Sequence, residues 1–320
     1  MRRILLLALV IYYHPGTADS APALPSIIIP RKSVEAYDKL GGKEVIFGLT
    51  ISGELRCSPM RHVMIYESVG GFSFGYGIED PPQTFPHVSV PFGLSLDGSA
   101  ATVTSLRNLK GYGQLSVLHL RGSLISDTEI EAACQLRSLS TLSLEGTSVT
   151  VAGLRHLHSL PYLRCLSVSG TKIGDAGTAE LKKLTCLHAL VLRGTGVTDA
   201  GIKGVLALDS LRVISLNDTE VTDKCLEELK NLPRLKHLFL SFTRISDDGL
   251  KEIRQLKSLE TLSLTGCKVS ATGLRQVGHM LNLTTLTLSG SKIDDDAMGV
   301  VSSFTKLQVL LLTWSNVTDK

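Results

Sequence analysis

Apolar residues return to the same positions every 24 residues over most of the chain. The clearest stretch is 190–201, which reads Leu-Val-Leu-Arg-Gly-Thr-Gly-Val-Thr-Asp-Ala-Gly and recurs in outline at 166–175 and 214–223. The second leucine of each Leu-x-Leu, or the valine that replaces it, keeps this spacing at ten positions: Leu96, Leu120, Leu144, Val168, Leu192, Leu216, Leu240, Leu264, Leu288 and Leu312. A period of 20–50 residues is typical of stacked repeats, so the pattern predicts a solenoid.

Each 24-residue unit predicts a short strand, a turn and a short helix. The alternation in Leu-x-Leu indicates a strand. The residue two positions after the second leucine is Gly in seven of the ten units, which favours a sharp turn. Hydroxyl or acidic residues at positions six and seven predict a helix N-cap, as in the capping-box sequence Ser126 to Glu129. Apolar residues at positions 10, 13 and 16 then share one helix face, which only a neighbouring unit can bury.

The third position after the second leucine is small and mostly hydroxylic. It is occupied by Ser99, Ser123, Thr147, Thr171, Thr195, Thr219, Thr243, Cys267, Ser291 and Ser315. A hydroxyl both donates and accepts hydrogen bonds, so we expect this column of side chains to satisfy buried backbone groups of the turn.

The repeated pattern Leu-x-x-Leu-x-Leu-x-x-Thr-x-Val-Thr-Asp-x-Gly-Leu resembles the leucine-rich repeat superfamily. It is most similar to the ribonuclease-inhibitor-like class with 24-residue units that is found in many exported bacterial proteins. The resemblance runs from about Leu94 to the C-terminus, and Tyr37 to Lys43 is similar to a Lys-Leu-Gly-Gly segment that often precedes such arrays. It implies an α/β fold: a right-handed solenoid with a curved parallel sheet on its concave face, short helices on its convex face and an N-terminal cap. It also implies a binding scaffold, with no shared catalytic residues.

Residues 1–23 are expected to form a secretory signal peptide. Arg2 and Arg3 precede a ten-residue apolar run from Ile4 to Tyr13, and small residues follow. The run is shorter than the about 20 residues that span a bilayer, so we expect no membrane span after cleavage. The predicted location is outside the cytoplasm, which means periplasmic, cell-surface or secreted. An uncleaved anchor is the alternative.

Residues 24–90 do not follow the period and are interpreted as an irregular N-terminal cap for the first repeat, or else as a small separate module. We expect a helix at 33–40, a strand at 45–47 that stops at Gly48, a strand at 62–66 and a loop from Gly70 to Pro91. The predicted domain organisation is therefore a signal peptide at 1–23, a cap at 24–90 and the solenoid at 91–320.

Composition and motifs favour a protein without catalytic, cofactor or metal sites. The net charge of +3 is too small to indicate nucleic acid binding. The six cysteines include no Cys-x-x-Cys pair, and the nine histidines show no metal-ligand spacing. Gly71 to Gly75 matches Gly-x-Ser-x-Gly, but the following Tyr76 to Pro82 cannot begin the helix that a nucleophile elbow requires. We therefore expect a chance match in a glycine-rich loop.

The candidate binding residues are those that interrupt a smooth concave face of Ser, Thr and Gly. The sequence predicts that His237, Phe239 and Phe242 project together from one repeat, near Asn217 and Asp218 of the preceding one. Trp314 takes the usual glycine position three repeats beyond Phe242, and charged residues follow the second leucine elsewhere. Exposed aromatic residues on such a face are typical of binding hot spots. The full candidate set is His237, Phe239, Phe242, Asn217, Asp218, Trp314, Arg193 and Arg121.

These features predict an exported, non-enzymatic scaffold that binds an unidentified protein or peptide through its concave face. The alternative is a substrate-recognition subunit of an F-box-like ubiquitin ligase, because some of these carry similar repeats. That alternative needs a helical bundle before the repeats, where this chain is rich in Gly and Pro. The final repeat has no closing helix, so we also expect an apolar end that supports end-to-end self-association.

Overall fold

A computed structural model of the chain describes residues 11–12, 32, 43–50, 55–58, 64–73, 87–99, 101 and 103–318. The strands are β1 (Ile11–Tyr12), β2 (Lys43–Thr50), β3 (Leu55–Ser58), β4 (Met64–Ser73), β5 (Phe92–Ser95), β6 (Leu115–His119), β7 (Thr141–Ser143), β8 (Cys165–Ser167), β9 (Ala189–Val191), β10 (Val213–Ser215), β11 (His237–Phe239), β12 (Thr261–Ser263), β13 (Thr285–Thr287) and β14 (Val309–Leu311). The helices are α2 (Val103–Asn108), α3 (Asp127–Ala133), α4 (Val151–His156), α5 (Gly174–Leu181), α6 (Asp199–Val205), α7 (Asp223–Leu229), α8 (Leu250–Ile253), α9 (Ala271–Val277) and α10 (Asp295–Val301), with 3₁₀ turns at Leu109–Gly111 and Leu157–Ser159.

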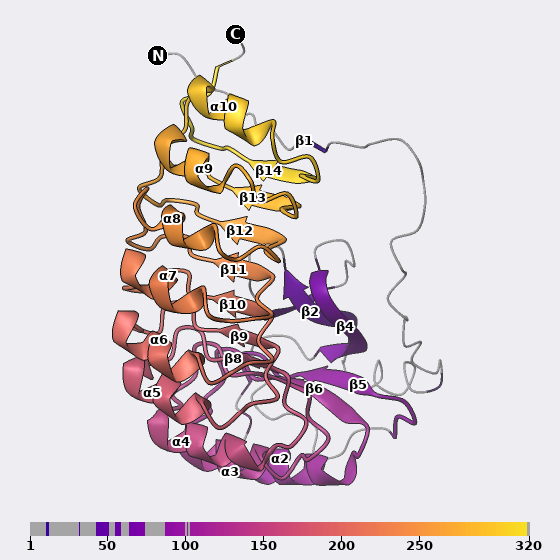
Figure 1. Cartoon of the computed structure of the whole chain (residues 1–320). Coiled ribbons are helices and arrows are strands. Elements are labelled where there is room, and N and C mark those ends of the chain that lie inside the picture. Colours follow the sequence, from indigo (N-terminus) through magenta and orange to yellow (C-terminus); the bar gives the residue numbers. More distant parts are fainter. Residues whose placement is uncertain are drawn as a thin grey trace, which may run out of the picture.

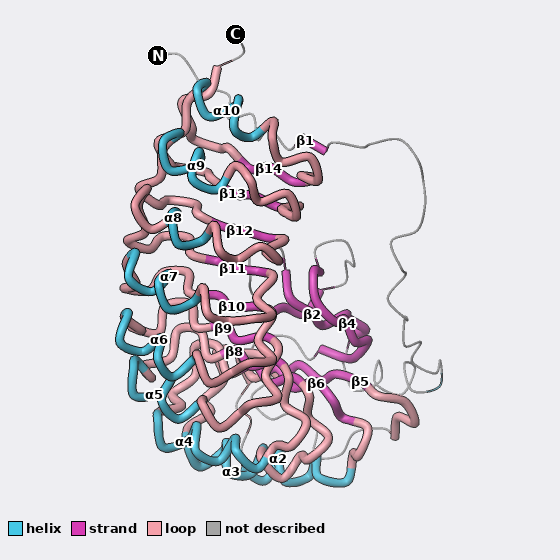
Figure 2. The backbone as a smooth tube through the Cα atoms, in the orientation of Figure 1, coloured by secondary structure: helices cyan, strands magenta, loops and turns pink. Residues whose placement is uncertain are grey.

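The repeats stack into an open solenoid. Strands β4 to β14 pair in parallel and in chain order, so each strand has its sequence neighbours on either side. Residues 24 apart face each other: Ile214 pairs with Leu190 on one side and with Leu238 on the other. Figure 1 shows the short helices α2 to α10 stacked along one side of this curved sheet, and Figure 2 shows loops closing each turn. The α/β solenoid predicted from the 24-residue period is therefore confirmed.

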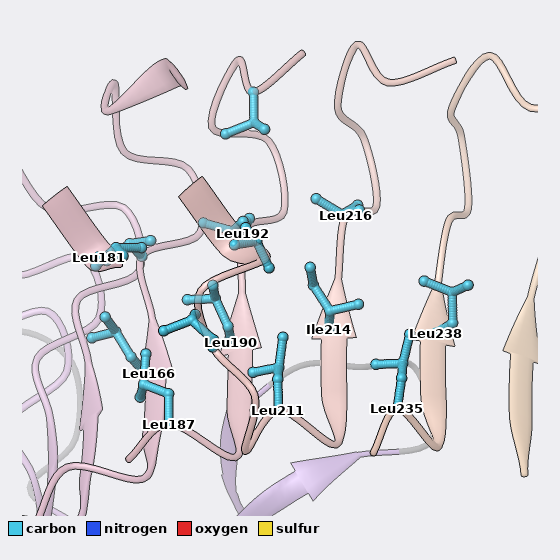
Figure 3. Close-up of a cluster of buried hydrophobic side chains, with 14 of the residues drawn as sticks. Leu166, Leu181, Leu187, Leu190, Leu192, Leu211, Ile214, Leu216, Leu235 and Leu238 are labelled. Carbon is cyan, nitrogen blue, oxygen red and sulfur yellow. The ribbon is translucent and has the colours of Figure 1, made fainter. Parts of the chain in front are cut away.

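The core is a set of parallel rows of aliphatic side chains between the sheet and the helices. Leu190, Ile214 and Leu238 come from successive strands and lie in one row, and Leu187, Leu211 and Leu235 form the row beside it (Figure 3). All of these side chains are buried. Because each repeat contributes the same rows, a repeat buries its apolar faces only against its neighbours.

The hydroxyl column behaves as predicted. From Ser99 to Thr243, the side chain donates a hydrogen bond to the carbonyl three residues earlier in the same turn, for example Thr147 Oγ1 to Leu144 O at 2.7 Å, Thr195 Oγ1 to Leu192 O at 2.6 Å and Thr219 Oγ1 to Leu216 O at 2.5 Å. Two members of the column reach further, because Cys267 Sγ and Ser291 Oγ contact the carbonyls of Leu240 and Leu264 in the preceding repeat. The column thus gives these turn carbonyls a side-chain donor, which in some turns adds to a backbone N–H, as at Leu144 O, where Thr147 N also donates at 3.2 Å.

A second column of polar contacts joins neighbouring repeats near six of the described helix starts. In one link of this aspartate ladder, the backbone N–H and the hydroxyl of Thr222 donate to the two carboxylate oxygens of Asp199, at 2.8 and 2.7 Å. The same hydroxyl accepts the N–H of Lys224 at 3.3 Å and caps α7. Equivalent links join Asp127 to Thr150, Asp175 to Thr198, Asp223 to Ser246, Asp247 to Ser270 and Asp295 to Thr318. These residues were predicted only to cap their own helices, and the structure adds an inter-repeat role.

Hydrogen bonds also set two carboxylate pKa values near the helix starts. Ser126 N–H donates to Glu129 at 2.9 Å, which confirms the capping box at α3. Burial raises the pKa of Glu129, but the hydrogen bonds from Ser126 outweigh this and leave the pKa below its usual value. The hydrogen bonds from Thr318 likewise lower the pKa of Asp295. Both carboxylates are therefore held in the charged form that accepts these bonds.

The region before the repeats is more regular than predicted. β2 does not stop at Gly48 but continues to Thr50, with an irregularity in its pairing to β4 between Phe47 and Leu49. β4 extends to Ser73, so Gly71 and Ser73 of the supposed loop belong to a strand that pairs with both β2 and β5. The expectation that a loop begins at Gly70 was wrong for Gly70 to Ser73, because these glycines are accommodated inside a sheet. The helix predicted at 33–40 lies outside the described residues.

Both ends of the sheet carry additional strands. At the first end, β4 pairs with β5. The rings of Phe72 in β4 and Phe92 in β5 are both buried, and their centroids are 6.4 Å apart. At the other end β1, from the predicted signal segment, pairs antiparallel with β14 through Ile11 and Leu310. The rest of the predicted signal peptide lies outside the described residues.

Replacing Thr219 with valine should lower the free energy of unfolding by about 1–3 kcal/mol, because the carbonyl of Leu216 loses its donor in a buried position. Urea denaturation measures this change. Thr272→Val is the matched control, since Thr272 is exposed on α9 and the substitution should have little effect. Equal urea midpoints for Thr219→Val and the wild type would contradict a stabilising role for the hydroxyl column.

Two helical glycines test how closely the repeats pack. A Cβ on Gly204 in α6 would lie 2.4 Å from the carbonyl oxygen of Thr178 in α5, whereas a Cβ on Gly299 in α10 would meet nothing within 4 Å. Gly204→Ala should therefore destabilise the chain by about 1–3 kcal/mol through overpacking. Gly299→Ala should be neutral or stabilise by up to about 1 kcal/mol. The same thermal shift for both variants would show that the helices do not touch as described.

Candidate functional site

The turn after each strand holds one residue per repeat in the left-handed backbone region. These residues form a line along the array that we call the turn column: Gly98, Gly122, Gly146, Gly170, Gly194, Asp218, Phe242, Gly266, Gly290 and Trp314, with φ between 54° and 70°. From Gly98 to Gly290, the backbone N–H of the turn-column residue donates to a carbonyl of the next repeat, for example Phe242 N to Thr265 O at 2.8 Å. This contact imposes the same turn conformation whether or not the residue is glycine.

Three repeats place a side chain where the turn favours glycine. Asp218, Phe242 and Trp314 have φ values of 54°, 57° and 56°. The left-handed conformation costs a residue with a Cβ about 1–2 kcal/mol, and it is unusual for a bulky side chain. Phe242 is nevertheless 58 % exposed and Trp314 is 73 % exposed, so neither contributes much to the core. Strain that the fold does not require is the pattern expected of residues kept for a function.

The ring of Phe242 lies along the turn column. A Cβ added to Gly266 would be 2.6 Å from Cδ1 of Phe242, so the ring rests against the backbone of the next repeat. This contact orients the ring without burying it, because more than half of the side chain stays exposed. Phe242 therefore offers a fixed aromatic face, which loses little side-chain entropy on contact with a partner.

A shallow polar hollow lies at the other half of the turn column. It has a volume of about 430 Å³ and a floor formed by the glycines of four consecutive turns. Its walls hold two ion pairs between neighbouring repeats: Arg121 Nε to Glu145 Oε1 at 3.2 Å and Arg193 Nε to Asp218 Oδ2 at 2.8 Å. The turn column therefore has a polar half with balanced charge and a half with two exposed aromatic residues.

The structure brings together only part of the predicted residue set. Arg121, Arg193 and Asp218 line the same hollow, and Phe242 occupies the turn next to Asp218. Glu145, the ion-pair partner of Arg121, was not among the predicted residues, although it holds the same repeat position as the two arginines. The spacing of 24 could have identified it, because equal positions in adjacent strands lie about 5 Å apart.

Three predicted residues are not exposed binding side chains. Phe239 was expected to project into solvent, and this is wrong because its side chain is fully buried. Asn217 is buried and accepts the backbone N–H of Ser241 through Oδ1 at 2.7 Å, so it serves the turn. His237 is half-buried with Nδ1 2.9 Å from Thr261 Oγ1, and burial lowers its pKa below the usual value.

In the described part of the chain, no three His, Cys, Asp or Glu side chains gather as metal ligands. No helix described here has the length and apolar character needed to cross a bilayer. Burial raises the pKa of the Cys134 thiol to about 12 and raises that of Cys225 as well, so these two thiols stay protonated at neutral pH.

The chain is similar to a repeat family and to two solved structures. A family model described as Leucine Rich repeat matches residues 159–181, 232–253 and 255–277. The chain is similar to the crystal structure of an internalin C2 from Listeria monocytogenes, with 21 % identity, a TM-score of 0.50 and coverage of 67 % of this chain and 84 % of that one. It is also similar to an internalin (inlF) from the same organism, with 22 % identity, a TM-score of 0.47 and coverage of 71 % and 75 %.

A search of curated proteins gives no match. The repeat match and the shared architecture with the internalin C2 structure concern the fold alone. Together with the parallel sheet, the aliphatic rows and the 24-residue register, they lead to one conclusion. The chain is a leucine-rich repeat solenoid.

Proposed function

We propose that this protein is a non-enzymatic, exported scaffold that binds a protein or peptide along its turn column. The observation that carries the proposal is the presence of Phe242 and Trp314 at positions where seven repeats use glycine. Both side chains occupy strained turns and remain exposed. Solvent-exposed aromatic side chains held in fixed positions are the groups most often found at the centre of protein interfaces.

The turn column also suits an extended polypeptide partner. Phe242 and Trp314 are three repeats apart, or about 15 Å at the spacing of neighbouring strands. Between them Gly266 and Gly290 leave a surface of backbone without side chains. The ion pairs around Arg121 and Arg193 continue the column with hydrogen-bonding groups. A partner lying along the column would meet aromatic anchors at one half and polar groups at the other.

Export is supported by the pattern of residues 1–23 alone, in which two arginines precede a ten-residue apolar run.

Self-association through the last repeat is also part of the proposal. Val309, Leu310 and Leu311 in β14 are half-buried, whereas the matching residues of β13 are buried. A hollow of about 460 Å³ lies beside them, lined by Val301, Ser302, Phe304, Thr305, Leu307, Gln308 and Leu310. A second copy that packs its own last repeat against this surface would cover it.

The double variant Phe242→Gly, Trp314→Gly tests the binding site. Glycine suits both turns, so the free energy of unfolding should stay the same or rise by about 1 kcal/mol per site. Peptides selected from a displayed library on the immobilised wild-type chain should bind the variant at least about 30-fold more weakly, which corresponds to loss of about 2 kcal/mol at a hot spot. Fluorescence anisotropy measures the dissociation constants.

The matched control is Leu124→Ser, Tyr162→Ser, which removes two exposed apolar side chains, 79 % and 63 % exposed, that lie outside the turn column. This control should keep wild-type affinity. Equal binding by the wild type and the glycine variant would contradict the proposed site. Loss of binding in the control alone would place the site elsewhere on the solenoid.

A further inference from the structure

The concave side of the sheet is closed over its centre. Five side chains on this side form an apolar group that we call the concave strip: Cys165, Ala189, Val191, Val213 and Phe239. They alternate along their strands with the leucines of the core and so point to the opposite face. Their exposed fractions are nevertheless only 0–2 %. A surface residue of an open sheet would not reach these values.

The repeats themselves cannot bury Phe239. Its neighbours on the adjacent strands are Ser215 and Ser263, whose side chains are too short to cover a phenyl ring. The helices lie on the far side of the sheet (Figure 1). The atoms that cover the concave strip therefore come from outside the array of repeats.

The three strands β2, β3 and β4, here called the N-terminal sheet, are placed to supply this cover. β4 continues the parallel sheet at its first end, where Gly71, Phe72 and Ser73 pair with Gly93, Leu94 and Ser95. In Figure 1, β2 and β4 lie on the side of the solenoid away from the helices. We propose that the N-terminal sheet, formed by residues 43–50, 55–58 and 64–73, docks on the concave strip as a built-in ligand of the concave face.

The fit between this cover and the concave face is incomplete. Ser143 Oγ and Ser215 Oγ are buried on the concave face and have no hydrogen-bond partner within the described residues. The hydroxyls of the turn, in contrast, bond to carbonyls along the array. Buried hydroxyls without partners weaken a contact. The N-terminal sheet is therefore expected to lift from the strip while the solenoid stays folded, which makes it an autoinhibitory cover for a second, apolar binding face.

The inference goes beyond the proposed function, because the turn column is exposed with the cover in place. It also explains why Phe239 and Phe242, three residues apart, have different roles. Phe239 is held under the cover, whereas Phe242 faces solvent at the turn. A partner of the concave strip must displace the N-terminal sheet, whereas a partner of the turn column need not.

Cys165 is a native reporter of the cover. It is a strip residue, is not part of a disulfide and is almost fully buried. Cys225 lies in the core between sheet and helices, and Cys186 is exposed. Alkylation of the full native chain with N-ethylmaleimide, followed by mass spectrometry, gives the labelling rate of each thiol. Comparing the same cysteine between variants removes differences in intrinsic reactivity.

In the wild type, Cys165 should label far more slowly than Cys186. Phe239→Asp places a charge under the cover and should raise the rate at Cys165 at least tenfold, while Cys225 keeps its wild-type rate. Phe239→Ser should give a smaller increase. Phe242→Asp, which adds the same charge at the exposed turn, should leave Cys165 protected.

Three results would overturn the inference. Wild-type Cys165 labelling as fast as Cys186 would show an open concave face. An unchanged Cys165 rate in both Phe239 variants would show that the strip does not hold the cover. Equal exposure of Cys165 and Cys225 in both Phe239 variants would show that the strip belongs to the solenoid core, with no separable cover.

Discussion

Contact between neighbouring repeats is the constraint on which the rest of the structure depends. No repeat buries its own apolar rows, so each needs the next at a fixed offset. Three lines of hydrogen bonds enforce that offset: the strand ladder, the turn N–H ladder and the aspartate ladder at the helix starts. All three join residues 23 to 25 apart, which is why the period tolerates no insertion from Leu96 to Leu312.

The same constraint decides which positions are free to vary for function. The turn N–H ladder holds the turn-column residues from Gly98 to Gly290 in the left-handed region, so glycine costs the fold least there. A side chain at this position strains the backbone without burying apolar surface in the core, so it stands out from the glycines of the other repeats. Asp218, Phe242 and Trp314 are such departures, and they lie on the edge of the solenoid that other chains can reach.

The repeated elements could be predicted from the sequence, whereas contacts with the non-periodic region could not. The Leu-x-Leu spacing was sufficient for the parallel sheet, and the Ser and Thr column was sufficient for the turn hydrogen bonds. The role of Asp199 between repeats was missed, because its place in the first turn of α6 explained it locally as part of the helix start.

The burial of Phe239 had no signal in its own repeat. It depends on a segment more than a hundred residues away that does not share the period. The strand character of Gly70 to Ser73 was missed for a related reason, since glycines weaken strand propensity but pairing with β2 and β5 overrides it. Phe242 and Trp314 were found because they break a periodic rule. The sequence thus identifies departures from the repeat better than contacts outside it.

A double-mutant cycle between Asp199 and Thr222 tests most directly whether polar contacts couple adjacent repeats. The free energies of unfolding of Asp199→Ala, Thr222→Ala and the double variant, measured by urea denaturation, give the coupling between the two residues. The account predicts a favourable coupling of about 1–2 kcal/mol, because both carboxylate oxygens of Asp199 bond to Thr222. Additive losses, with a coupling below about 0.3 kcal/mol, would contradict it.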